Sequence, residues 1–148
     1  YELGACDWSS DVCSSDLHRI GLLCGGFGIS AVLAALFLGP LAIEMTAGED
    51  YLGAYWPLVV YLISVTIYFF GISYQSVILS VNKPDLILWI YVAGNIVYFS
   101  SLVPLTSEFG VVGAAAAHVV YHTVWLISMK LIMDHLINAE LRASDAVT

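Results

Sequence analysis

Charged side chains are scarce in this chain of 148 residues: Lys and Arg together number 4, and charged residues make up 11% of the whole. A soluble domain carries about 25% charged residues, so this composition argues against a protein surrounded by water on all sides. The few basic residues are scattered along the chain, whereas nucleic-acid binding needs clustered Lys and Arg. We therefore expect no nucleic-acid partner.

Cysteine is also rare, with 3 residues in the chain. Cys6 and Cys13 lie in a polar N-terminal stretch, and Cys24 stands alone in an apolar run. A lone thiol in such a run is usually a small buried hydrophobe. No acid or Cys cluster stands at the spacing of metal ligands, so we predict no disulfide framework, no metal site and no cofactor.

Long apolar runs fill most of the chain instead, and 60% of all residues are hydrophobic. A run of about 20 apolar residues is long enough to cross a bilayer core as a helix. We predict an all-α, polytopic membrane protein with four transmembrane helices, at about 20–43, 55–81, 86–104 and 111–133. The third helix is expected to stop near Pro104, because proline disfavours continuation of a helix.

Residues 7–17, DWSSDVCSSDL, differ in composition from everything that follows. The codons permitted for this segment include a common short-read sequencing adapter translated in frame. We therefore interpret residues 1–17 as a sequencing artefact that is disordered and has no function. On this interpretation the chain is a C-terminal fragment, with a membrane bundle at 18–133 and a polar tail at 134–148.

The distribution of charge predicts an orientation in the membrane. Each basic residue lies before the first predicted helix, between the second and third, or at the end of the fourth: Arg19, Lys83, Lys130 and Arg142. The loops on the opposite side carry acidic residues only: Glu44, Glu49, Asp50 and Glu108. By the positive-inside rule the basic side is cytoplasmic, which predicts a cytoplasmic C-terminus.

Three stretches of sequence suggest a family. Residues 48–54, GEDYLGA, fit a loop of the type G-x-x-Y-x-x-A, and residues 76–84, SVILSVNKP, fit a helix that ends in a small-polar segment. Residues 109–117, FGVVGAAAA, fit a "yGxxGAAxA" opening of the next helix. In this order, over residues 20 to about 133, they resemble the C-terminal domain of polysaccharide flippases of the multidrug/oligosaccharidyl-lipid/polysaccharide exporter superfamily.

This resemblance implies transport without chemistry on the substrate, so we do not expect an enzyme. It implies flipping of undecaprenyl-pyrophosphate-linked oligosaccharide across the bacterial inner membrane, for O-antigen, capsule or exopolysaccharide assembly. The implied partners are this lipid-linked oligosaccharide, the bilayer and helices of the same protein upstream of the fragment. Two alternatives remain open: a drug or metabolite antiporter of the same superfamily, and a small tetraspan membrane scaffold.

Polar side chains inside the apolar runs are the candidate site residues. His118 and His122 share a helix face because they stand four residues apart, and ionisable side chains within a membrane span usually face the bundle interior or a wet cavity. Asn95, Gln75 and Tyr74 also require a partner at membrane depth. These side chains are candidates for lining a substrate cavity, and the two histidines also for carrying protons. Hydrogen bonding between helices is the more common role of such side chains, and it is the interpretation we prefer.

Small residues mark the start of the fourth predicted helix. Gly110 and Ala114 stand four residues apart, as do Gly113 and Ala117. Small side chains at this spacing allow the backbones of neighbouring membrane helices to approach each other. We therefore predict that these residues serve helix packing.

Overall fold

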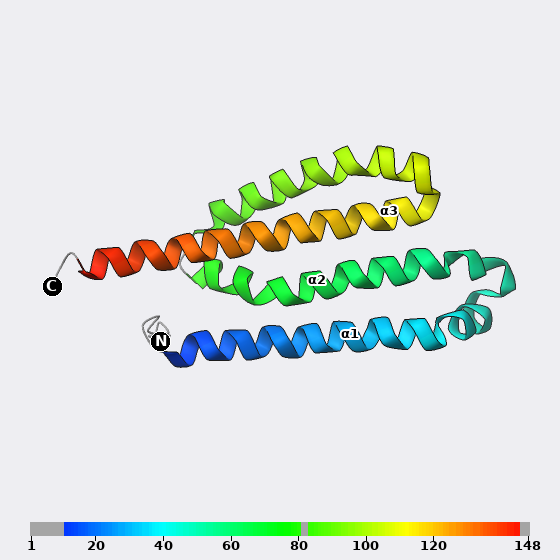
Figure 1. Ribbon diagram of the computed structural model, residues 1–148, viewed down its shortest axis with the longest axis horizontal. Helices are drawn as coiled ribbons and strands as arrows, with labels where there is room; N and C mark the ends of the chain where they lie inside the picture. Colours follow the sequence, from blue (N-terminus) through cyan, green and yellow to red (C-terminus); the bar gives the residue numbers. More distant parts are fainter. Residues whose placement is uncertain (1–10, 81–82, 146–148) are drawn as a thin grey trace.

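Apart from Gly48 and Lys83, every residue whose backbone the structure describes lies in a helix. The computed structural model describes the backbone of residues 11–80 and 83–145, and the side chains of 19–76, 78–79 and 83–136. Its elements follow in the order α1 (Asp11–Ala47), η1 (Glu49–Ala54), α2 (Tyr55–Ser80) and α3 (Pro84–Asp145), where η1 is a 3-10 helix (Figure 1). The predicted all-α class is confirmed.

Three stretches of helix are long and apolar enough to cross a membrane: Arg19–Ala47, Glu49–Ser76 and Pro84–Leu136. Many of their large apolar side chains point outward; Phe37 is 81% exposed and Leu23 is 75% exposed. Extended apolar surface of this kind is costly in water and is expected in lipid. The chain is therefore compatible with a multi-pass membrane protein.

Helix α3 doubles back on itself at Gly110, which has φ 59° and ψ −135° inside an otherwise helical segment. Figure 1 shows the two halves running side by side in opposite directions, and we call residues 84–109 the first arm and residues 111–145 the second arm. The prediction that the helix stops near Pro104 is wrong, because Pro104 lies within the helix. The reversal needs a positive φ, which glycine adopts without the steric cost of a side chain.

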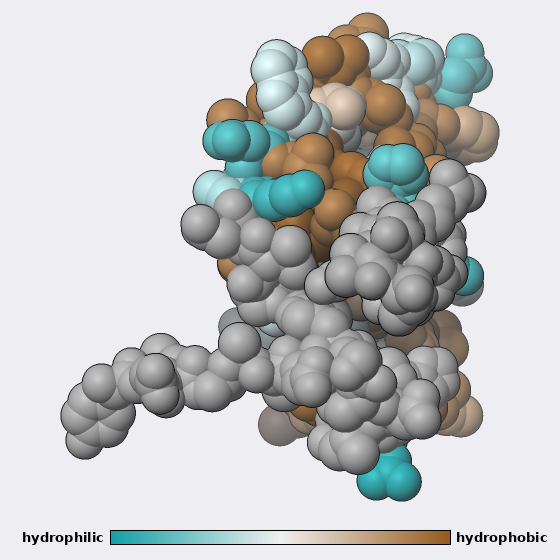
Figure 2. All heavy atoms as spheres, turned by 90° about the vertical axis from the view of Figure 1, so that its left-hand side faces the viewer, coloured by the Kyte–Doolittle hydropathy of each residue, from teal (hydrophilic) through white to brown (hydrophobic). Residues whose placement is uncertain are grey.

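Helix α2 lies between α1 and α3. It contacts both of them, whereas α1 and α3 do not contact each other within the described residues. The start of α1, the junction of α2 with α3 and the end of α3 lie at one end of the molecule, and η1 and the Gly110 reversal lie at the other (Figure 1). Figure 2 looks onto the first end, where hydrophilic side chains stand out among apolar ones.

The hydrophobic core lies between α2 and α3. Ile78 and Met129 are fully buried, and Trp125 is 1% exposed. The remaining buried members of this core come from the first arm of α3: Ile87 and Ile90. A Cβ atom on Gly71 would collide with the indole of Trp125, so the absence of a side chain on α2 makes room for the largest side chain of the second arm.

Helix α1 packs against α2 in a different way, because the only buried residues in its described part are glycines: Gly21, Gly25, Gly28 and Gly39. A Cβ atom on Gly28 would lie 2.8 Å from the Thr66 hydroxyl oxygen and 3.0 Å from the Thr66 Cα. A row of small residues lets two membrane helices approach closely and gain dispersion contacts. The backbone of α1 thus lies close to α2 at the positions where α1 has glycine.

The two chain ends differ in part from expectation. Residues 11–17, expected to be disordered, form the first turns of α1, and residues 1–10 lie outside the described residues. Residues 134–145 of the predicted polar tail are helical, which does not conflict with the prediction, and residues 146–148 lie outside the described residues.

Candidate functional site

The two predicted histidines lie together in the interface between α2 and the second arm of α3. Their rings are stacked, with centroids 6.2 Å apart and an angle of 22° between the ring planes. Both are half-buried. The i, i+4 spacing thus brings two imidazoles onto one helix face, as the sequence predicts.

His122 has hydrogen-bond partners from both elements. Its Nδ1 lies 2.6 Å from the hydroxyl oxygen of Ser64 on α2 and 3.2 Å from the backbone carbonyl oxygen of His118. A carbonyl oxygen only accepts hydrogen bonds, so this geometry favours the tautomer in which Nδ1 carries the proton and donates it. Ser64 is fully buried, so this contact is a buried polar link between α2 and the second arm of α3.

His118 has different surroundings. Its Nδ1 is buried and has no hydrogen-bond partner among the described residues. Aromatic rings contact it instead: the centroid of Tyr98, on the first arm, lies 4.7 Å away, and that of Tyr61, on α2, lies 5.3 Å away. The imidazole thus sits where α2 and both arms of α3 meet.

Aromatic side chains enclose His122 as well. The rings that surround it have centroids 4.7 to 6.4 Å from its own: Tyr121, Tyr68 and Trp125. The Trp125 Nε1 is buried and has no hydrogen-bond partner in the part of the chain that the structure describes. We call the two histidines, Ser64 and the surrounding Tyr61, Tyr68, Tyr98, Tyr121 and Trp125 the histidine cluster.

The other predicted site residues lie apart from one another. Gln75 accepts a hydrogen bond of 3.1 Å from the Tyr91 hydroxyl, which joins α2 to the first arm. Tyr74 packs against the hydrophobic core. Asn95 is exposed and its amide donates to the Tyr91 carbonyl oxygen, one turn back in the same helix. The five predicted residues therefore do not line one common cavity.

The small residues near the reversal have several roles. Gly110 forms the turn and has no atom within 4 Å of an added Cβ, so its predicted packing role is corrected. A Cβ on Gly113 would collide with the Leu105 carbonyl, which places Gly113 at the close contact between the two arms. Ala117 is fully buried, consistent with the predicted packing.

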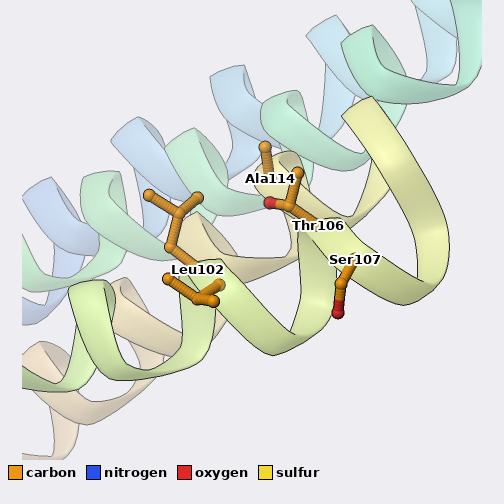
Figure 3. Close-up of a pocket in the computed structure, with 5 residues that line it drawn as sticks. Leu102, Thr106, Ser107 and Ala114 are labelled. Atoms are coloured by element: carbon orange, nitrogen blue, oxygen red, sulfur yellow. The ribbon is translucent and has the colours of Figure 1, made fainter.

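Ala114 lies at the edge of a hollow of about 430 Å³ beside the reversal. Figure 3 shows Leu102, Thr106 and Ala114 grouped around it, while Ser107 points away from Ala114. The Ser107 hydroxyl donates to the Pro104 carbonyl oxygen at 2.8 Å. The lining is almost wholly apolar, so this hollow offers few groups that could recognise a sugar or a phosphate.

Charged groups lie outside the histidine cluster. Every Asp, Glu, Lys and Arg whose side chain is described is exposed. Within the described residues, no three His, Cys, Asp or Glu side chains come together as a metal site would require. The cluster thus combines neutral hydrogen bonding, two imidazoles and aromatic rings in the interior of an apolar bundle.

Ser64 and the tyrosine rings are the cluster members that sequence reasoning missed as partners of the histidines. Ser64 is separated from His122 by 58 residues, and no local pattern indicates such a pairing. The one available signal is that Ser64 interrupts an apolar run.

The fold and the cluster together define an all-helical chain with three membrane-length helices and a polar, aromatic centre. The chain matches no family model, no curated protein and no solved structure.

Proposed function

We propose that this chain forms the C-terminal bundle of a bacterial inner-membrane flippase for lipid-linked oligosaccharides. The observation that carries the proposal is the histidine cluster: hydrogen-bonding and ionisable side chains inside membrane helices are costly and usually mark a transport pathway. The ordered resemblance of three sequence stretches to polysaccharide flippases supplies the substrate class.

The proposal includes four membrane crossings and a cytoplasmic C-terminus. The reversal at Gly110 supports it, because it divides α3 into two antiparallel arms. The grouping of chain segments supports it too: the start of α1, the end of α2, the start of α3 and the end of α3 lie at the same end (Figure 1). A bilayer that contains all three helices would therefore hold α3 as a hairpin, with the basic end in the cytoplasm.

In this proposal the chain supplies a wall of the substrate pathway and no binding site for the pyrophosphate. An anionic lipid headgroup requires cationic partners, and the bases with described side chains are all exposed: Arg19, Lys83 and Lys130. The groups that hold the pyrophosphate would come from helices upstream of this bundle. The histidine cluster would then take part in the conformational change that moves the substrate, and would not bind the pyrophosphate.

The experiment is genetic complementation. The open reading frame that contains this chain is expressed in a strain without its own oligosaccharide flippase, and surface polysaccharide is measured. Restored polysaccharide is expected. Antibiotic resistance without polysaccharide would indicate the antiporter instead, and an inserted protein that restores neither function would contradict the proposal.

Variants at the histidine cluster connect this test to the structure. His122→Gln removes the hydrogen bond that joins Ser64 to the second arm, and we expect it to reduce polysaccharide export. Thr123→Ala is the matched control, because Thr123 is exposed and its hydroxyl donates to the Val119 carbonyl oxygen of the same helix. Equal export by the two variants, at equal amounts in the membrane, would show that the cluster has no part in transport.

A further inference from the structure

Asn95 carries an exposed amide near the middle of a membrane-length stretch of helix. It lies on the first arm, which forms the edge of the bundle opposite α1 (Figure 1). At 1.5 Å per residue, Asn95 stands roughly 16 Å from the start of this arm at Pro84 and roughly 21 Å from its end at Phe109. The hydrocarbon of a bilayer is about 30 Å thick, so a first arm that crosses it holds Asn95 well inside.

The Asn95 amide has more hydrogen-bonding groups than its own helix uses. Its Nδ2 donates to the Tyr91 carbonyl oxygen at 2.8 Å, which leaves the second N–H and the amide oxygen for another partner. Exposed hydroxyls differ, because those of Ser30, Ser100 and Thr123 donate their single proton within their own helices. Unpaired amide groups are costly in hydrocarbon, so Asn95 requires a polar partner at its own depth.

The residues around Asn95 form an exposed stripe with the spacing of a coiled coil. Leu88, Val92, Asn95 and Phe99 follow one another at steps of four, three and four residues, and all four are exposed. Side chains at this spacing lie along one side of a helix and fit against a second helix that crosses at a small angle. We call these four residues the Asn95 seam. The described residues of α2 and of the second arm leave it uncovered.

A second copy of the chain has the chemistry that the seam requires. Two copies inserted in the same direction hold Asn95 at equal depth, and a two-fold axis along the membrane normal brings identical residues opposite each other. A carboxamide is complementary to itself, because the free N–H of each copy can donate to the amide oxygen of the other. One Asn within an apolar seam also fixes the register in which two helices pair.

We infer that the Asn95 seam is a dimerisation surface, at which the Asn95 side chains of two copies exchange hydrogen bonds across a two-fold axis. The apolar members of the seam pack on both sides of this pair. The inference goes beyond the proposed function, because it holds whatever substrate the protein moves. It rests on that proposal in one respect, the crossing of the bilayer by the first arm.

Association is measured with the full chain in lipid bilayers. Copies that carry a donor or an acceptor dye at the C-terminus are mixed, and energy transfer is followed as added lipid dilutes the protein. The parent chain is expected to form dimers that dissociate on dilution. Asn95→Leu is expected to raise the dissociation constant about tenfold, the equivalent of about 1.4 kcal/mol, because two hydrogen bonds between membrane helices are lost.

Two further substitutions separate the hydrogen bonds from a general change in polarity. Asn95→Gln keeps the carboxamide and is expected to retain most of the association. Ser100→Leu is the matched control, because Ser100 is exposed on the same arm, lies outside the seam and donates to the Ile96 carbonyl oxygen. A parent chain that stays monomeric at every dilution, or an Asn95→Leu chain that associates as strongly as Ser100→Leu, would overturn the inference.

Cross-linking locates the contact and keeps the inference testable if Asn95→Leu does not fold. The native cysteines are replaced by serine, and Val92→Cys and Ala93→Cys are introduced separately in chains that retain Asn95. Both positions are exposed, but Val92 lies in the seam and Ala93 lies outside it. Oxidation is expected to give disulfide-linked dimers with Val92→Cys. Equal or stronger cross-linking with Ala93→Cys would overturn the inference.

These measurements distinguish the inference from the proposed function. Neither involves a substrate, so failed polysaccharide export by a chain that dimerises through Asn95 would contradict the proposed function alone. Export by a chain that stays monomeric would overturn the inference alone. A Val92→Cys thiol that reacts with a membrane-impermeant reagent would overturn the inference together with the four membrane crossings.

Discussion

The two interfaces of α2 are built on opposite principles. Toward α3, the helix meets large side chains that fill space, such as Trp125 and Met129, together with the hydrogen-bonded pair of Ser64 and His122. Toward α1, it meets a row of buried glycines, and the Phe27 ring adds an edge-to-face contact with Phe69. The first interface is sensitive to the removal of atoms and the second to their addition. The contrast shows that burial alone does not reveal how a membrane helix is held.

The strongest test of this contrast removes the largest buried side chain. Trp125→Ala is expected to lower the free energy of unfolding by about 3–5 kcal/mol, because it leaves a cavity between α2 and α3. Reversible unfolding in detergent micelles measures the change. Trp89→Ala is the control, because Trp89 is 68% exposed. Equal effects of the two substitutions would show that Trp125 is not part of a packed core.

The complementary test adds atoms to the glycine row. Gly28→Leu is expected to cost about 1–3 kcal/mol, the usual range for overpacking, because the new side chain meets both the backbone and the hydroxyl of Thr66. Cross-linking between α1 and α2 should decrease in parallel. Gly26→Leu is the control, because an added Cβ there has no neighbour within 4 Å. If both leucines were tolerated, α1 would not pack on α2 through its glycines.

The reversal of α3 is a further place where glycine is required, for its backbone conformation. Gly110→Ala is expected to destabilise the protein by about 1–2 kcal/mol, because alanine at a positive φ brings its Cβ close to a carbonyl oxygen. Gly53→Ala should change stability less, because Gly53 is also open to space but is not at positive φ. Unfolding measurements that show no difference between the two alanines would contradict the turn at Gly110.

The smallest expected effect concerns the hydrogen bond between Ser64 and His122. Ser64→Ala is expected to cost about 1 kcal/mol, because His122 then keeps only its longer contact with the His118 carbonyl oxygen. Ser100→Ala is the control, since Ser100 is exposed and donates within its own helix to Ile96. A cost for Ser64→Ala no greater than that of the control would mean that hydrogen bonding contributes little to the α2–α3 interface.

Much of the fold follows from hydropathy and helix spacing. The expected segments at 20–43 and 55–81 correspond to α1 and α2, because long apolar runs favour helix in any arrangement. The end expected at Pro104 is wrong because a proline inside a membrane helix is tolerated when its surroundings satisfy the freed carbonyl. The reversal occurs six residues later, at Gly110, shortly after the polar residues Thr106, Ser107 and Glu108.

The site was predictable only in part. The stacking of His118 and His122 follows from their spacing along one helix, whereas the Ser64 hydroxyl reaches His122 from another helix. The outward position of Asn95 was not predictable either, since polarity alone says nothing about which face of a helix meets a neighbour. Contacts between distant segments depend on how helices rotate against each other, and the buried positions of α1 add little information because they are glycines.

The glycine face of α1 has a consequence for evolution. Substitutions on the lipid side of this helix exchange one apolar side chain for another, and we expect little selection against them. On the inner side the permitted alternatives to glycine are few, and Thr66 and Phe70 can change only together with the glycines that receive them. Descendants of this protein should thus keep glycine at positions 21, 25 and 28 after the rest of the α1 sequence has diverged.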